Sequence, residues 1–168
     1  MYGYEASTEN ATSKVTAVLK APTKASMALA LNGVTLANEA TATWLGGVNY
    51  LTVNTEYGTT KLLYVVEVTK TGTSIGTLTV TSADGTKTGD TKLTVAGSRL
   101  AGTSLVYTVS DTSISTPTLD DVLEGWTAWD GTSDITVAHE KYVGVAEVLH
   151  NGMVKSFGQV QADSDGEA

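Results

Sequence analysis

Cysteine is absent from the 168-residue sequence, and proline (two residues), phenylalanine (one) and histidine (two) are scarce. Without cysteine the chain forms neither a disulfide nor a cysteine-ligated zinc site, and this absence favours assembly in a reducing compartment. No apolar run approaches the roughly 20 residues that span a bilayer. The first residues, Met1–Glu5, lack both the basic and the apolar region of a secretion signal. We therefore expect no membrane partner and no export by a signal peptide.

Charged residues make up only 17% of the chain, and the net charge of −8 is unevenly placed. Residues 1–72 are neutral overall, so residues 73–168 carry the whole negative charge. An acidic half disfavours nucleic-acid backbones and anionic membranes as partners. The simplest interpretation of this half is a well-solvated surface.

Short alternating apolar runs predict β-strands throughout the chain. In Lys61–Thr69, the side chains of Leu62, Tyr64, Val66 and Val68 fall on one face. Their neighbours Leu63 and Val65 are also apolar, which predicts a central strand covered on both sides. Roughly a dozen such strands, with turn signals between them, are typical of sandwiches rather than of alternating strands and helices. We predict an all-β fold of two small immunoglobulin-like β-sandwich domains in tandem.

The division of the chain follows from its turn-rich stretches. Lys70–Gly76 is rich in Thr, Gly and Ser and predicts the domain boundary. We expect a polar, extended N-terminal arm over residues 1–12, a first sandwich over residues 13–72 and a second over residues 73–161. An acidic tail over residues 162–168 completes the chain.

Two Asn-Gly pairs, Asn32-Gly33 and Asn151-Gly152, predict tight hairpins, because both residue types tolerate the positive φ angles of a type I′ turn. The second hairpin would join Tyr142–Leu149 to Met153–Val160. Near Thr118, a single capped helical turn is the only helix that we expect.

No residue pattern in the sequence indicates an enzyme or a cofactor site. His139 and His150 stand outside every metal-binding spacing, and exposed loop positions account for both. No GxSxG elbow is present. The acidic run Asp163–Glu167 imitates the start of a calcium loop, but the chain ends before the later ligand positions. We therefore predict no catalytic residue, no metal and no cofactor.

Aromatic residues supply the candidate contact sites. Trp126 and Trp129 either stack on a sugar as an exposed platform or, together with Trp44, fill the small cores; we favour the cores because the chain has few other large aromatic residues. Tyr2 and Tyr4 lie in the polar arm and are candidate docking residues.

Two segments resemble known families. The first runs from Leu31 to Thr69 and includes Ala40–Leu45, Leu51–Val53 and Tyr64–Thr69; it resembles cadherin-like or bacterial immunoglobulin-like sandwich repeats. The second comprises Gly89–Val95, Tyr107–Val109, Gly125–Thr136 and Val143–Val148 and ends at Gly158; it resembles a β domain of virion proteins of tailed bacteriophages.

The second resemblance implies a capsid decoration protein that is assembled in the host cytoplasm and stabilises the virion surface. Its partner would be the major capsid protein, and its own copies would form an oligomer, for which a trimer suits threefold lattice sites. The neutral half with its arm would dock by adding a strand to a capsid edge, or the opposite polarity would hold and the C-terminal half would dock. A tail or baseplate protein and a carbohydrate- or cell-surface-binding module are the alternatives.

Overall fold

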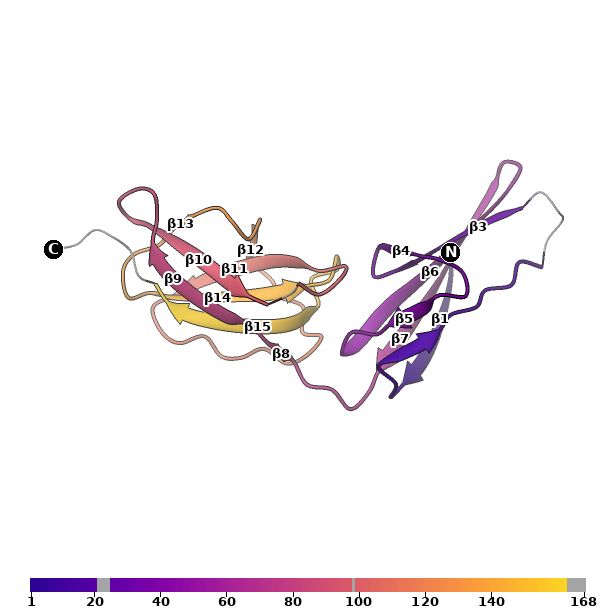
Figure 1. The fold of residues 1–168 in the computed structure, drawn as a ribbon, viewed down its shortest axis with the longest axis horizontal. Coiled ribbons are helices and arrows are strands. Elements are labelled where there is room, and N and C mark those ends of the chain that lie inside the picture. Colours follow the sequence, from indigo (N-terminus) through magenta and orange to yellow (C-terminus); the bar gives the residue numbers. More distant parts are fainter. Residues whose placement is uncertain (21–24, 98, 163–168) are drawn as a thin grey trace. The chain divides into compact units, whose positions relative to one another are not determined.

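The computed structural model describes residues 1–20, 25–97 and 99–162, and it divides the chain into two units, Met1–Ser74 and Ile75–Ala168. The described residues form fifteen strands and no helix (Figure 1). The prediction of an all-β fold with two small sandwich domains in tandem is confirmed. The units divide after Ser74, inside the Thr/Gly/Ser stretch. No described helix is long and apolar enough to cross a membrane. The residues 163–168 of the expected acidic tail lie outside the described residues.

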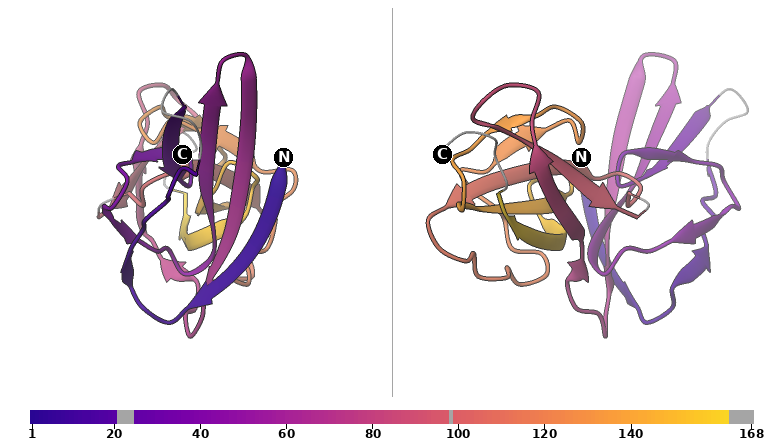
Figure 2. Two further views of the ribbon diagram at one scale, coloured as in Figure 1. Left: turned by 90° about the vertical axis from the view of Figure 1, so that its right-hand side faces the viewer. Right: turned by 60° about the vertical axis from the view of Figure 1, so that its left-hand side comes forward.

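Unit 1 is built on a five-stranded sheet with the order β1-β7-β6-β3-β4 (Figure 2). Its β1 strand runs parallel to β7, and the other neighbours are antiparallel. Strands β2 and β5 pair with each other and form a separate two-stranded sheet. The strands are β1 (Tyr2–Thr8), β2 (Thr12–Lys14), β3 (Ser26–Leu31), β4 (Val34–Leu36), β5 (Thr41–Thr43), β6 (Gly47–Tyr57) and β7 (Thr60–Lys70).

The core of unit 1 lies on one face of the five-stranded sheet. Trp44 is buried there, and its indole Nε1 donates to Ser13 Oγ at 3.0 Å, so its polar atom is satisfied. The side chains on the opposite face of β7, which include Leu63 and Val65, are partly exposed. Strand β7 is central in the sheet, as predicted. In the described part of unit 1, however, no layer fully buries this opposite face, so the strand is not covered on both sides as expected. The buried cluster consists of Val15, Leu29, Ala42, Trp44, Leu51 and Val68.

Unit 2 contains a three-stranded sheet, β13-β10-β9, and a five-stranded sheet, β12-β11-β14-β15-β8. The last strand, β15, pairs in parallel with the first, β8. The strands are β8 (Gly76–Thr77), β9 (Thr79–Asp84), β10 (Asp90–Ala96), β11 (Ser104–Ser110), β12 (Thr127–Trp129), β13 (Ile135–Thr136), β14 (Tyr142–Val148) and β15 (Val154–Gln161).

The five-stranded sheet of unit 2 is covered on both faces, which explains why β14 and β15 read as nearly continuous buried runs. One face packs on the smaller sheet through Val143 and Val145, both fully buried. The other face is covered by residues 111–126, which we call the covering segment. Ile114, Leu123 and Trp126 from this segment pack against a buried cluster of β14 and β15 residues.

The two Asn-Gly hairpins use different turns. Asn32 and Gly33 have φ angles of 50° and 82°, as a two-residue type I′ turn requires. At the second hairpin only Gly152 has a positive φ, of 83°, and Leu149 N–H donates to Met153 O while Gly152 N–H donates to Leu149 O. The predicted type I′ turn is wrong there. A longer loop closes the hairpin, with glycine supplying the left-handed residue.

Two local expectations differ from the structure. Residues 2–8 of the expected N-terminal arm form strand β1, because the backbone of this segment pairs along β7 from Tyr2 to Thr8. The expected helical turn at Thr118 is an isolated turn, in which Asp121 N–H donates to Thr118 O and Thr118 N–H donates to the Asp121 carboxylate. The side chain of Asp121 caps this turn, so no helix is needed.

Candidate functional site

Strand β1 forms a free edge of the unit 1 sheet. Thr8 O accepts from Thr71 N–H, so the backbone groups of Thr8, and of every second residue before it, face β7. The N–H and C=O groups of Gly3, Glu5 and Ser7 therefore face away from the sheet. Among the described residues, no strand pairs with that side of β1. An unpaired edge of this kind is a template for strand addition.

Tyr2 and Tyr4, the predicted docking residues, lie on this edge strand. Both are about half exposed, with 50% and 55% of their surface accessible. The Tyr2 ring stacks on Tyr64 of β7 with a centroid distance of 5.2 Å and an interplanar angle of 18°. Tyr2 is therefore partly held by its own sheet, and the backbone edge, more than the ring, is what remains open to a partner.

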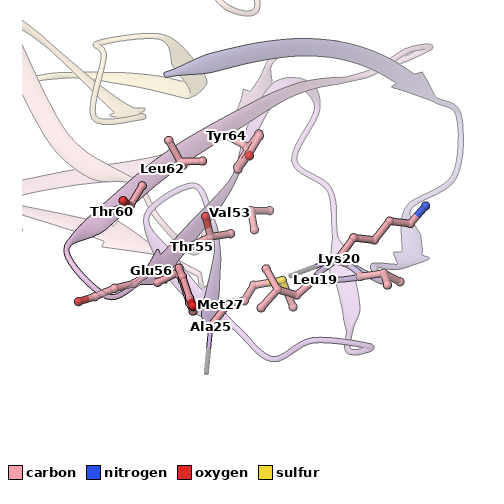
Figure 3. A pocket seen from close by; sticks show the side chains of 13 residues that line it. Leu19, Lys20, Ala25, Met27, Val53, Thr55, Glu56, Thr60, Leu62 and Tyr64 are labelled. Carbon is pink, nitrogen blue, oxygen red and sulfur yellow. The ribbon is translucent and has the colours of Figure 1, made fainter. Parts of the chain in front are cut away.

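A shallow groove opens at one end of unit 1, where the β6–β7 hairpin extends past the core (Figure 3). Its volume is about 490 Å³. Met27, Val53 and Leu62 provide apolar walls, and Glu56 and Lys20 also line it. This volume falls within the range of small-ligand pockets, roughly 300–1,000 Å³. Among the described lining residues, Lys20 and Glu56 are the charged ones.

The tryptophans take core positions. Trp129 is 8% exposed, and its Nε1 donates to Ser133 O at 2.8 Å. Trp126 is partly buried and meets the edge of Phe157, with a centroid distance of 6.2 Å. The structure does not bring the two indoles together as an exposed pair, since Trp129 belongs to the core between the sheets and Trp126 to the cluster under the covering segment.

Unit 2 contains two buried charged residues that were not predicted from the sequence. Glu147 is 2% exposed and accepts from Arg99 Nε at 3.1 Å, from Leu100 N–H at 3.0 Å and from Ser156 Oγ at 2.5 Å. Lys155 is 3% exposed and is paired with Asp120 of the covering segment. For Glu147 the signal was a single charge within the otherwise apolar strand β14, which indicates a buried, partnered charge. Strand β15 has a mixed composition and gives no such signal for Lys155.

Each of these buried charges has an oppositely charged partner, Arg99 for Glu147 and Asp120 for Lys155. Burial lowers the pKa of Lys155, and the hydrogen bond and the charge of Asp120 act in the opposite direction. The described residues contain no group of three or more metal-ligating side chains. His139 and His150 both lie on exposed loop positions.

Two aspartates organise loops of unit 2. Hydrogen bonds from the Ser133 side chain, then from the Ser133 and Thr132 backbone, hold the pKa of Asp130 well below its usual value. Hydrogen bonds from the side chain and backbone of Thr86 lower the pKa of Asp134 in the same way. Both carboxylates act as loop caps.

Residues 83–165 match the family model described as "S-layer protein SbsC C-terminal domain". This match covers just under half of the chain and falls entirely within unit 2. No curated protein matches the chain.

Two solved structures are similar to the chain. The crystal structure of the S-layer protein SbsC, domains 7, 8 and 9, is 16% identical with a TM-score of 0.40, and the alignment covers 94% of this chain and 58% of that one. The structure of surface layer protein SbsC, domains 4–9, is 15% identical with a TM-score of 0.44, and covers 94% and 30%. The chain thus spans 58% or less of either structure's length.

These findings correct the interpretation of the second segment. The residues that resemble a phage virion domain, Gly89 to Gly158, lie within the region that matches the surface-layer family. The predicted capsid decoration function, the virion location and the major capsid protein as partner are therefore wrong. The tail or baseplate protein and the carbohydrate-binding module are not matched either.

Proposed function

We propose that this chain is a structural part of a cell-surface layer, in which copies associate side by side, and that it has no catalytic role. The observation that carries the proposal is the family match over residues 83–165, because the matched family is a domain of a surface-layer protein. Two compact β units joined in one chain suit a repetitive, space-filling assembly.

The contact between copies is best supplied by unit 1, whose sheet has two different edge strands, β1 and β4, each with one side that no other described strand pairs with. Pairing β1 with β1 across a twofold axis would place Glu5 opposite, or close to, its own symmetry mate, which is unfavourable for like charges. Strand β4 (Val34–Leu36) is uncharged, and Val34 is 47% exposed. We therefore propose head-to-tail pairing of β1 with β4 of the next copy.

Such a contact is heterologous, so it propagates into an open array when the rotation between copies does not close a ring. It would extend one sheet through successive copies by backbone hydrogen bonds. Its strength would depend little on side-chain identity.

The test is the oligomeric state of the full chain across a concentration series, measured by light scattering after gel filtration and by negative-stain electron microscopy. We expect growing, ordered assemblies. The variant Ser7→Pro removes one outward N–H of β1 and should weaken assembly at least tenfold, because proline cannot donate to an added strand. A chain that stays monomeric at every concentration would contradict the proposed self-association.

Ser7→Ala is the matched control, because it removes the hydroxyl and keeps the outward N–H. It should assemble like the original chain. Equal assembly of Ser7→Pro and Ser7→Ala would show that β1 does not form the contact. The proposed pairing of β1 with β4 would then be wrong, whereas the proposed role in a surface layer would stand.

A further inference from the structure

Lys155 and Asp120 form an enclosed pair in unit 2. The Lys155 side chain is 1% exposed and the Asp120 side chain 22%, and Lys155 Nζ directly contacts Asp120 Oδ1. Lys155 lies on β15, on the face that the covering segment packs against, and Asp120 belongs to that segment. The pair therefore joins two separate layers of the unit.

The backbone holds both partners in place. Asp120 N–H donates to Val154 O at 3.0 Å, and Val154 N–H donates to Asp121 O at 2.9 Å, so the segment is pinned to the residue before Lys155. Asp120 itself has a φ of 70°, a left-handed conformation that aspartate tolerates and that persists only where the surroundings enforce it. The amine and the carboxyl group are thus held in contact before any reaction.

We propose that Lys155 and Asp120 condense to an intramolecular amide, an isopeptide bond that ties β15 covalently to the covering segment. Holding two reactants in contact replaces an encounter between separate molecules and supplies a very high effective concentration. A lysine amine is a competent nucleophile when it is desolvated. Burial lowers the pKa of Lys155, which favours the uncharged amine that the reaction needs.

The step balances without any added reagent. A proton passes from the ammonium group to the carboxylate, which leaves a neutral amine and a neutral carboxylic acid. The amine nitrogen attacks Asp120 Cγ, a proton of the nitrogen moves to the hydroxyl oxygen, and the C–O bond breaks to release one water. Because one positive and one negative charge vanish together, the net charge of the chain does not change.

Condensation is favoured by the surroundings of the pair. Two charges held out of water carry a desolvation cost, and a neutral amide removes both. The partial exposure of Asp120 gives the released water a way out. Lys141 and Asp111 form a second lysine–aspartate pair of unit 2 with side chains 39% and 81% exposed, and its solvated ammonium group should stay unreacted.

The test is the intact mass of the full chain under denaturing conditions. We expect a mass lower than the sequence mass by one water molecule. Tryptic digestion should then yield one branched species that joins residues 100–141 to residues 142–168, because trypsin does not cleave after an acylated Lys155. A folded chain that keeps the full sequence mass after prolonged incubation at neutral pH overturns the proposal.

The variant Lys155→Arg keeps the positive charge but not the nucleophilic amine, so its mass should equal its sequence mass. A water loss that survives in Lys155→Arg, or a branch that maps to Lys141, would also overturn the assignment. The original chain carries the decisive measurement by itself, so the test does not depend on the folding of a variant.

Discussion

Asn32 Nδ2 donates to Asn49 Oδ1 at 3.0 Å, and both side chains are buried in unit 1. Asn32 belongs to the type I′ turn between β3 and β4, whereas Asn49 lies in β6. Asn49 Nδ2 also donates to Leu45 O and Gly47 O, both at 2.9 Å, and Asn49 Oδ1 accepts from Leu45 N–H at 2.9 Å. One fully buried amide thus holds a hairpin turn and the entry into β6 together.

We expect Asn49→Ala to destabilise unit 1 by about 2–4 kcal/mol, because it leaves several buried backbone groups without partners. The measurement is urea unfolding of the full chain, with hydrogen–deuterium exchange to assign the affected unit. Asn54→Ala, at an exposed position of the same strand, is the control and should change the stability by less than about 0.5 kcal/mol. Equal effects of the two variants would remove the structural role assigned to Asn49.

Replacement of Glu147 by alanine should destabilise unit 2 by about 3 kcal/mol, because Ser156, Leu100 N–H and Arg99 all lose their acceptor. Protection of β14 and β15 amides against hydrogen exchange reports the loss. Glu124→Ala, on an exposed part of the covering segment, is the control. If both variants unfold at the same denaturant concentration, the carboxylate of Glu147 is not a structural centre.

Gly158→Ala should prevent stable folding of unit 2 or cost it several kcal/mol, about 3 or more. A Cβ atom at Gly158 would lie 2.2 Å from the backbone oxygen of Leu78. Leu78 lies between β8 and β9, and its N–H donates to Phe157 O, so its backbone is held against β15. Gly3→Ala on the open edge strand meets no atom within 4 Å and is the matched control. Thermal unfolding followed by circular dichroism compares the two. An unchanged transition for Gly158→Ala would contradict the close approach of β15 to Leu78.

Acid should weaken unit 2 through its capping aspartates. The pKa of Asp130 is lower in the folded state than in the unfolded chain, so the unfolded state binds more protons as the pH falls and stability is lost below about pH 4. Asp130→Asn keeps an oxygen acceptor for the Thr132 and Ser133 N–H groups, which donate to Asp130 Oδ1. Its stability should depend less on pH between about 4 and 2.

Urea midpoints of the two proteins at several pH values provide the measurement. Adding Asp134→Asn should flatten the dependence further, because Thr86 lowers the pKa of Asp134 in the same direction. Parallel pH profiles for the original chain and Asp130→Asn would show that this carboxylate does not contribute.

The strand pattern predicted the fold class because each unit buries a face with period-two alternation. The hairpin at Asn32-Gly33 was also predictable, because the residues that favour a type I′ turn are adjacent in the sequence. The pairing of β1 with β7 was not predictable from local signals: Tyr2–Thr8 is polar, and its partner lies about 60 residues further along the chain.

The buried charges show a second limit of sequence reasoning. Glu147 interrupts the apolar run of β14, which is a signal for a buried, partnered charge, whereas Lys155 lies in a strand of mixed composition that gives no such signal. The partners are Arg99 and Asp120, which come from irregular segments and carry no periodic signal. The covering segment was likewise invisible, because its packing residues Ile114, Leu123 and Trp126 are spaced by loop geometry rather than by a regular repeat.

In each unit the first strand of its main sheet runs parallel to the last, β1 beside β7 and β8 beside β15. Tension applied between the two ends of a unit would therefore slide these strands past each other and strain their hydrogen bonds together, whereas an antiparallel pair pulled at one end opens bond by bond. In unit 1, seven residue pairs between β1 and β7 would carry this load together, whereas in unit 2 only two pairs between β8 and β15 would do so. Under a stretching force, unit 1 should resist rupture longer, and β8 should be the first strand to detach.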